Sequence, residues 1–237
     1  LWVAAEITVV VMAAAVAHEE DNAFFIIINL SPPVYAGGFF YNCIMQFEHI
    51  IPGHNIDLER LTDDHISELE LIAIDDRIWQ NLPYKITDKH SFDTFIKDRL
   101  QGNLSGQQVT YVIRNKSNGQ VCGCTGFINI DAVNHQLEIG PTWLSPIVWG
   151  TKINIESKYL LLTFCFERAK IMRVEFRTRE TNIRSQKAIE KIGGIKEGIL
   201  RAHRKNDDGT FRNTIVYSII QPDWPATKHM LEALISK

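Results

Sequence analysis

Apolar and polar residues follow a spacing typical of strands along some stretches of this chain and a spacing typical of helices along others. Four runs of mainly Val, Ile, Leu, Thr and Tyr, bounded by turn residues, predict strands: residues 55–61, 107–114, 120–130 and 135–144. Asn118 and Gly119, between the second and third runs, are typical of a tight hairpin turn. Successive runs joined in this way are expected to pair as antiparallel strands.

Helical spacing interrupts these runs after the first strand. Residues 62–73 predict a helix whose apolar stripe consists of Ile66, Leu69 and Ile74. A second helix is expected to begin at Ser91 as its cap and to face inward with Phe92, Phe95, Ile96 and Leu100. Trp79 and Tyr84 lie in the loop between the two helices. Two readings of these aromatic residues stay open, as part of the core or as the lining of a pocket.

The remainder of the chain alternates between helices and strands. A helix is expected to bury Ile155, Tyr159, Leu162 and Phe166, which recur at helical spacing. The later elements are, in chain order, a strand over 173–178, a helix that Asn182 or Thr181 caps and Gly193 ends, strands over 195–205 and 211–220, and a helix over 226–235 with Met230, Leu231 and Leu234 inward. Antiparallel hairpins followed by one β-α-β crossover predict a mixed α/β (α+β) fold. We expect a mostly antiparallel sheet of about six to seven strands, flanked by helices.

The loop before the helix at residue 155 has the features of an anion site. Gly150 allows a sharp turn or a close approach of a ligand to the backbone. The amides of residues 151–156 would open the helix with unpaired N–H groups, and Lys152 would add a positive charge. Asn154 is the expected N-cap, and Glu156 suits the positive end of the helix dipole. The pattern therefore predicts a phosphate-binding helix start.

Residues 1–44 differ from the rest of the chain. They contain four acidic residues and no Lys or Arg, and their first apolar stretch is short for a membrane span and is interrupted by Glu6. We expect them to be an extension upstream of a domain that covers residues 45–237 and naturally begins at Met45. The alternative is a real N-terminal hairpin, with a strand over 24–30.

Composition limits the classes of function. The chain has 237 residues, 45% of them hydrophobic and 22% charged, which is typical of a globular protein of the cytoplasm. A net charge of −3 gives no reason to expect nucleic-acid binding, and no segment predicts membrane insertion. The four cysteines, including Cys122 and Cys124, have no zinc-like spacing and are expected to be reduced core thiols. No metal site is expected.

An ordered set of residues in the second half resembles a known superfamily. The set comprises Gly150 and Glu156 at the first helix, then Asn182, Ser185 and Gly193 at the second. It is similar to the core of the GNAT superfamily of acyl-CoA-dependent N-acetyltransferases, in the branch of the RimJ and RimL ribosomal-protein acetyltransferases. The resemblance covers roughly residue 46 to the C-terminus. Two positions depart from the pattern: Lys152 replaces a loop glycine, and Ile189 replaces a tyrosine that many relatives carry.

The resemblance implies a GNAT fold, acetyl-CoA as co-substrate and transfer of an acetyl group to an amine. The acceptor would be a protein N-terminus or a small molecule, and a homodimer stays open. In this family the strand at 135–144 splays from its neighbour and pairs with the pantetheine arm of CoA. The residues expected to bind CoA are therefore Ile139, Gly140, Trp149, Gly150, Thr151, Lys152, Ile153, Asn154, Ile155, Asn182 and Ser185.

Acetyl transfer needs a neutral amine, a polarised thioester and a stabilised thiolate, and positioning can supply much of the rate. Glu138, on the splayed strand, is the candidate base, directly or through a water molecule; the alternative is an outward-facing strand carboxylate. Ser185 is the candidate hydrogen-bond donor to the thiolate, or else a helix-cap hydroxyl. His203 is an alternative base. A second hypothesis for the whole chain is a non-catalytic CoA-binding or regulatory protein, because of the residues at 152 and 189.

Overall fold

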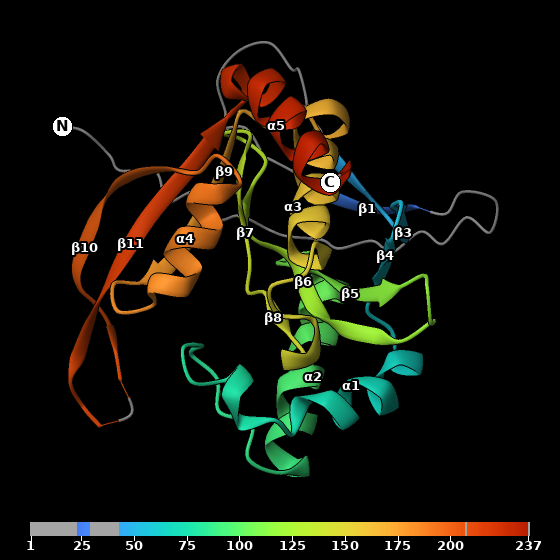
Figure 1. Cartoon of the computed structure of the whole chain (residues 1–237), viewed down its shortest axis with the longest axis vertical. Helices are drawn as coiled ribbons and strands as arrows, with labels where there is room; N and C mark the ends of the chain where they lie inside the picture. Colours follow the sequence, from blue (N-terminus) through green and yellow to red (C-terminus); the bar gives the residue numbers. More distant parts are fainter. Residues whose placement is uncertain (1–22, 29–42, 207, 237) are drawn as a thin grey trace, which may run out of the picture.

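The main sheet runs through the whole molecule and carries helices on both faces (Figure 1). The computed structural model describes residues 23–28, 43–206 and 208–236. Among these residues the sheet has nine strands, in the order β10-β11-β9-β7-β6-β5-β4-β3, with β8 beside β6. The strands are β3 (Ile50–Pro52), β4 (Ile56–Arg60), β5 (Val109–Asn115), β6 (Val121–Asp131), β7 (Gln136–Ile139), β8 (Trp143–Leu144), β9 (Arg173–Arg179), β10 (Ile195–Lys205) and β11 (Phe211–Ile220). The fold class is as expected, but the count of six to seven strands was too low because the short strands β3 and β8 were missed.

Two apolar clusters fill the two faces of the sheet. The described part of the chain has five α-helices: α1 (Ile66–Ala73), α2 (Lys89–Ser105), α3 (Ile153–Thr163), α4 (Ile183–Lys191) and α5 (Trp224–Ser236). The larger cluster includes core residues of α3, α4 and α5 and the strand residues that face them. The smaller cluster joins α1 and α2 to the other face of β5, β6 and β8. Burial of these large apolar side chains is the main source of stability in such a fold.

The sheet opens between β7 and β9. These strands pair in parallel from Gln136 opposite Arg173 to Glu138 opposite Glu175, and the pairing ends there. Beyond this point the chain stays beside β6, because the amide of Gly140 donates to the carbonyl of Gly126 at 3.0 Å. The run at 135–144, expected to form one strand, is therefore divided into β7 and β8 at Gly140.

Two helix starts differ from those predicted. Helix α3 begins at Ile153, so the N-cap is Lys152 and Asn154 lies inside the first turn. Helix α2 begins earlier than expected, with Asp88 as N-cap and Ser91 as its partner in a capping box. Sequence patterns locate a helix more reliably than its first residue, because several polar residues near the start can cap it.

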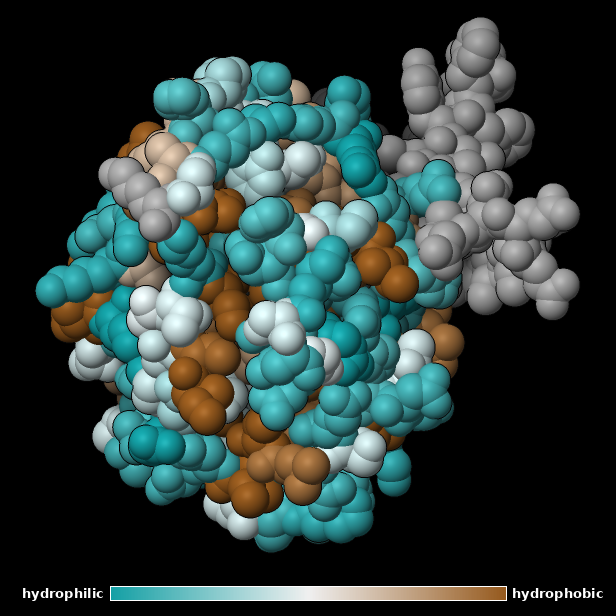
Figure 2. Space-filling model, turned by 45° about the vertical axis from the view of Figure 1, so that its right-hand side comes forward, coloured by the Kyte–Doolittle hydropathy of each residue, from teal (hydrophilic) through white to brown (hydrophobic). Residues whose placement is uncertain are grey.

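Two residues assigned to apolar stripes are exposed instead. Ile74 is 74% exposed because α1 ends at Ala73, and Ala73 takes the buried position. Met230 is 36% exposed, whereas its neighbour Leu231 is buried in the larger cluster. Figure 2 shows that hydrophobic residues also reach the surface on the face drawn, with several of them gathered in a band toward the bottom of the view.

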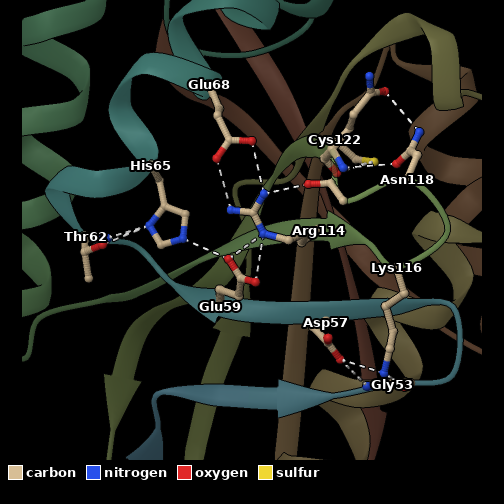
Figure 3. A network of polar contacts seen from close by, with 12 residues as sticks. Gly53, Asp57, Glu59, Thr62, His65, Glu68, Arg114, Lys116, Asn118 and Cys122 are labelled. Carbon is tan, nitrogen blue, oxygen red and sulfur yellow. Dashed lines mark hydrogen bonds and ion pairs between the residues drawn. The ribbon is translucent and has the colours of Figure 1, made fainter.

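An ionic cluster ties helix α1 to the sheet (Figure 3). The guanidinium of Arg114, on β5, contacts Glu59 of β4 at 2.8 Å and Glu68 of α1 at 3.0 and 3.1 Å. Glu59 also contacts Nε2 of His65 at 2.9 Å, and Nδ1 of His65 accepts from the amide of Thr62 at 3.1 Å. We call these residues, Glu59, His65, Glu68 and Arg114, the Arg114 cluster.

A separate two-stranded ladder precedes the main sheet. Strand β1 (Ala23–Ile28) pairs with β2 (Cys43–Glu48) in an antiparallel manner, close to the hairpin strand considered for residues 24–30. In β2, Phe47 is fully buried and its ring lies 5.4 Å from that of Phe164. The other residues of the 1–44 segment, apart from Cys43 and Ile44, lie outside the described part of the chain. The domain boundary at residue 45 stays a prediction.

Candidate active site

The start of helix α3 offers unpaired backbone donors to open space. Gly150 has φ +78°, and a Cβ added to it would meet no atom within 4 Å. Thr151 closes the turn, since its hydroxyl donates to the carbonyl of Val148 at 2.7 Å and accepts from the amide of Ile153 at 3.4 Å. The next amides, of Asn154 and Ile155, belong to the first turn and have no acceptor within the helix. This part of the loop therefore fits an anionic group such as a diphosphate.

Two charged residues near the start of α3 form hydrogen bonds with neighbouring elements of the fold. The ammonium of Lys152 donates to the carbonyl of Ile235, in the last turn of α5, at 3.0 Å. Glu156 is 2% exposed, and one of its oxygens accepts from the amides of His54 and Asn55 at 2.7 and 2.8 Å. Glu156 thus holds the turn between β3 and β4 against α3, a role that the sequence did not indicate.

The backbone at the opening between β7 and β9 and the cap of helix α4 provide further parts of the candidate site. Ile139 and Gly140 lie where β7 leaves β9, and the parallel ladder no longer pairs their backbone with β9. At α4, the side chain of Asn182 accepts from the amide of Ser185 at 3.1 Å and so caps the helix, as expected. The hydroxyl of Ser185 is half-buried, and no partner for it is found among the described residues. Ser185 is therefore not the helix cap.

Glu138 is buried at the end of the parallel ladder. It is 8% exposed; its Oε2 accepts from the amide group of Asn129 at 2.8 Å and lies 3.6 Å from Nε of Arg177. Burial raises the pKa of its carboxyl group, and the nearby Arg177 offsets part of that rise. A carboxylate with a raised pKa is a better proton acceptor at neutral pH, so the environment suits a general base. The alternative of an outward-facing carboxylate does not fit its burial.

Arg184 of α4 lies over the loop before α3, a contact that the sequence analysis missed. Its guanidinium carbon is 4.0 Å from the centre of the Trp149 ring, within the range of a cation–π interaction. The indole N–H of Trp149 donates to the carbonyl of Leu144 at 2.9 Å. Trp149 therefore links the starts of α3 and α4, and no spacing in the sequence pairs these two residues.

The aromatic residues between α1 and α2 belong to the smaller cluster. Trp79 is 5% exposed, and its ring packs against those of Phe95 and Trp143. Tyr84 packs against Phe95, and its hydroxyl accepts from Arg99 at 3.2 Å. The core reading is therefore correct for Trp79.

A cavity of about 10 Å³ lies beneath α2 and reaches Gly140. Its lining includes Arg99 and Trp143, each of which has a buried N–H without a partner among the described residues. This volume has room for about one water molecule, which could satisfy these donors. The cavity is too small for an acceptor substrate.

A larger groove of about 1150 Å³ lies between α3, α5 and the turns before β4 and β6. His54, Lys116 and Lys152 are among its lining residues, so it has a basic side. His203, the alternative base, lies elsewhere, on β10, and its Nδ1 is 3.0 Å from the hydroxyl of Thr214.

The described residues contain no cluster of His, Cys, Asp and Glu that could hold a metal ion. Cys122, Cys124 and Cys165 are buried free thiols, and burial raises the pKa of each. No helix in the described part of the chain has the length and apolarity needed to cross a membrane.

The arrangement of strands, opening and helix starts is that of an acetyltransferase domain. The family described as "Acetyltransferase (GNAT) domain" matches residues 55–195, which is more than half of the chain. The chain therefore belongs to the GNAT acetyltransferase family, and the expected family and fold are confirmed.

Particular relatives support the same assignment. The "Putative ribosomal N-acetyltransferase YdaF" of Bacillus subtilis (strain 168) is 30% identical over 115 residues, an alignment that covers 46% of this chain and 59% of YdaF. A solved structure described as a "putative acetyltransferase" of T. thermophilus is 31% identical, with a TM-score of 0.72 over 80% of this chain and 98% of the other. A RimL structure with coenzyme A, described as "Ribosomal L7/L12 alpha-N-protein acetyltransferase", has a TM-score of 0.64 and 21% identity over 72% and 97% of the two chains. This last likeness shows the fold alone.

Proposed function

We propose that the protein transfers an acetyl group from acetyl-CoA directly to an amine. The observation that carries the proposal is the opening between β7 and β9 beside the unpaired first-turn amides of α3. Backbone groups of Ile139 and Gly140 would hold the pantetheine arm, and the amides of Asn154 and Ile155 would hold the diphosphate. Asn182 would keep α4 at the same opening. Acetyl-CoA supplies the activated acetyl group.

Glu138 and Ser185 would assist the transfer from two sides of the opening. Glu138 would accept a proton from the acceptor ammonium, directly or through water, which makes the amine nucleophilic. The hydroxyl of Ser185 would donate a hydrogen bond to the leaving thiolate. Serine is a poor acid, so stabilisation of charge is its expected contribution. No triad is required, because positioning of amine and thioester can supply much of the rate.

A protein N-terminus is the favoured acceptor, and a small amine is the alternative. The name of YdaF, a ribosomal N-acetyltransferase, supports the first choice. The cytoplasm is the corresponding location, and a homodimer remains a prediction. The competing function is CoA binding without catalysis: the side chain of Ile189 has no proton to donate, so this core residue cannot replace the tyrosine acid found in many relatives.

A thiol-release assay tests the proposal. The protein is mixed with acetyl-CoA and a panel of short peptides and small amines, and mass spectrometry identifies any acetylated product. We expect release of CoA that depends on the acceptor and is matched by acetylated amine. Binding of CoA without release for every acceptor would support the non-catalytic alternative instead.

A further inference from the structure

Lys158 is the buried lysine of helix α3, and its amine meets two hydroxyl groups. The residue is 6% exposed, and Nζ lies 2.9 Å from Oγ1 of Thr125 and 2.6 Å from Oγ1 of Thr142. The two threonine hydroxyls are themselves 2.9 Å apart. The three polar atoms therefore form a closed ring of hydrogen bonds, which we call the Lys158 ring.

The ring leaves fewer protons unpaired around a neutral amine than around an ammonium. An ammonium donates to both threonine hydroxyls, which leaves its third N–H and one hydroxyl proton without an acceptor in the ring. A neutral Lys158 can donate to Thr142, whose hydroxyl donates to Thr125, whose hydroxyl in turn donates to the nitrogen lone pair. Only the second N–H of the neutral amine then has no acceptor in the ring.

The electrostatic surroundings agree with the neutral form. Burial alone lowers the pKa of Lys158 to about 7, and no charged side chain contributes to the shift. The group facing Nζ from β6 is Thr125, and the group from the turn after β7 is Thr142. On α3 itself, the carboxylate of Glu156 is bound to the turn between β3 and β4. A buried amine without a counter-ion costs stability, so the ring is not explained as a stabilising ion pair.

The ring joins the two segments that the proposed function assigns to CoA. Thr142 lies two residues after Gly140, in the turn where the chain leaves β9. Lys158 lies on α3, whose first turn carries the unpaired amides. Thr125 lies on β6, the strand against which the turn packs through the bond from Gly140 to Gly126. The ring is therefore a side-chain connection between the opening and the helix start.

We propose that Lys158 is a positioning residue: through Thr142 and Thr125 it holds the turn after β7 at a fixed distance from the first turn of α3. This inference rests on the proposed placement of CoA. The pantetheine arm would bind to the turn after β7 while the diphosphate binds to the first turn of α3. Both parts of CoA can bind at once only when the distance between these two segments is correct. Loss of the ring is therefore expected to weaken binding of the arm and to leave binding of the nucleotide end unchanged.

Calorimetry with two ligands tests this role. One ligand is CoA, and the other is adenosine 3′-phosphate 5′-diphosphate, which keeps the nucleotide and the diphosphate of CoA but lacks the pantetheine arm. For Lys158→Met and for Thr142→Val we expect CoA affinity to fall about 10-fold, the equivalent of one or two lost hydrogen bonds. The affinity for the nucleotide without the arm is expected to stay within roughly twofold. Because both changes break one ring, the double variant should bind CoA no more weakly than either single variant.

Lys187→Met is the control for loss of a lysine charge, since Lys187 is exposed on α4. Its CoA affinity should equal that of the wild type. Unchanged CoA affinity in folded Lys158→Met or Thr142→Val would overturn the positioning role, and so would an equal loss for both ligands. Thr142→Val removes only a hydroxyl group from a half-buried position, so this variant is expected to fold. Its CoA affinity tests the positioning role if Lys158→Met does not fold.

Thiol release distinguishes this inference from the proposed function. If the wild type binds CoA but acetylates no amine, the proposed function fails, and the affinity ratio still decides the role of Lys158. If the wild type acetylates amines, Lys158→Met should also lower kcat at saturating acetyl-CoA by about 10- to 100-fold, because the thioester is misplaced. If the wild type binds no CoA, both proposals fail.

Discussion

Two polar groups tie a helix to the sheet in this protein, and they do so by opposite means. The Arg114 cluster fixes α1 with opposite charges close to solvent: the side chains of Arg114 and Glu68 are 24% and 42% exposed. The Lys158 ring fixes α3 with one amine and two hydroxyls, and it contains no opposite charge. Both groups use side chains from a helix and from strands that are distant in the sequence.

The presence or absence of an opposite charge distinguishes the two groups: the Arg114 cluster is a structural contact, whereas the Lys158 ring is expected to serve ligand binding. In the Arg114 cluster, hydrogen bonds raise the pKa of Arg114 and lower that of Glu68, so each partner keeps the other charged. Near solvent such a pair adds little to the free energy of unfolding, and its desolvation penalty is also small. The Lys158 ring carries the desolvation cost of a buried amine, and it lies beside the opening between β7 and β9. We therefore expect its loss to weaken the binding of CoA and to change stability in a way that depends on pH.

The largest effect is expected in the pH dependence of stability. The pKa of Lys158 is about 7 in the fold, below its ordinary value of 10.5. Between these values the unfolded chain binds one more proton than the folded chain at this residue, so its contribution to stability rises with pH. Relative to Lys158→Met, the wild type should gain up to roughly 4 kcal/mol of unfolding free energy from pH 7 to 10.5. Urea denaturation of both proteins across this range measures the difference; a difference independent of pH would contradict a neutral buried amine.

Glu138→Gln tests the carboxylate beside the opening. Because burial raises the pKa of Glu138, its base form appears at a higher pH than that of an ordinary glutamate. The variant should lose about 100-fold in kcat at neutral pH and lose the basic limb of the profile. The deficit should shrink at high pH, where more of the acceptor amine is already neutral. A wild-type pH–rate profile would exclude Glu138 as the base.

Ser185→Ala tests the hydroxyl at the start of α4. A neutral hydrogen bond to the thiolate contributes modestly, so we expect a loss of about 10-fold in kcat. Calorimetry should show nearly unchanged CoA affinity, because Asn182 caps the helix through the amide and not the hydroxyl. An equal loss in affinity and kcat would make Ser185 a binding residue only.

Glu68→Gln is the matched change in the Arg114 cluster, away from the opening. It should cost about 0.5 kcal/mol of stability and leave kcat unchanged, since the pair is partly exposed and solvent screens it. Because the fold lowers the pKa of Glu68, the pair stabilises the protein fully at pH values above the ordinary pKa of a glutamate. This stabilisation is lost as the pH falls through the pKa that Glu68 has in the folded protein. Thermal melts at neutral and acidic pH, with and without salt, measure it. A large fall in kcat would mean that the Arg114 cluster also supports the site.

Removal of residues 1–44 should have the smallest effect. Among the described residues, strand β1 pairs with β2 and with no other strand, and the buried Phe47 is retained in a chain that starts at Met45. This shortened chain should melt cooperatively near the temperature of the full chain. Insolubility or a much lower melting temperature would show instead that the segment is a structural part of the domain.

Local patterns predicted the elements well, because the alternation in residues 195–205 and 211–220 and the cap at Asn182 depend on neighbours in the sequence. The opening at the run 135–144 was expected only from the family resemblance, because the separation from β9 depends on a strand that is distant in the sequence. The anion site at Gly150 and the following amides was predicted from the local sequence, whereas Glu138 and Ser185 came from the family resemblance. The contacts of Lys158, Arg184 and Glu156 were missed because each depends on a partner far away in the chain.

The structure of the protein with CoA bound is the most direct test of the proposed site. The account predicts diphosphate oxygens at the amides of Asn154 and Ile155, and the pantetheine arm alongside Ile139 and Gly140 in the opening. The larger groove between α3 and α5 offers a competing location, with basic residues in its lining. CoA bound entirely within that groove, with no contact to Ile139 or Gly140, would contradict the account.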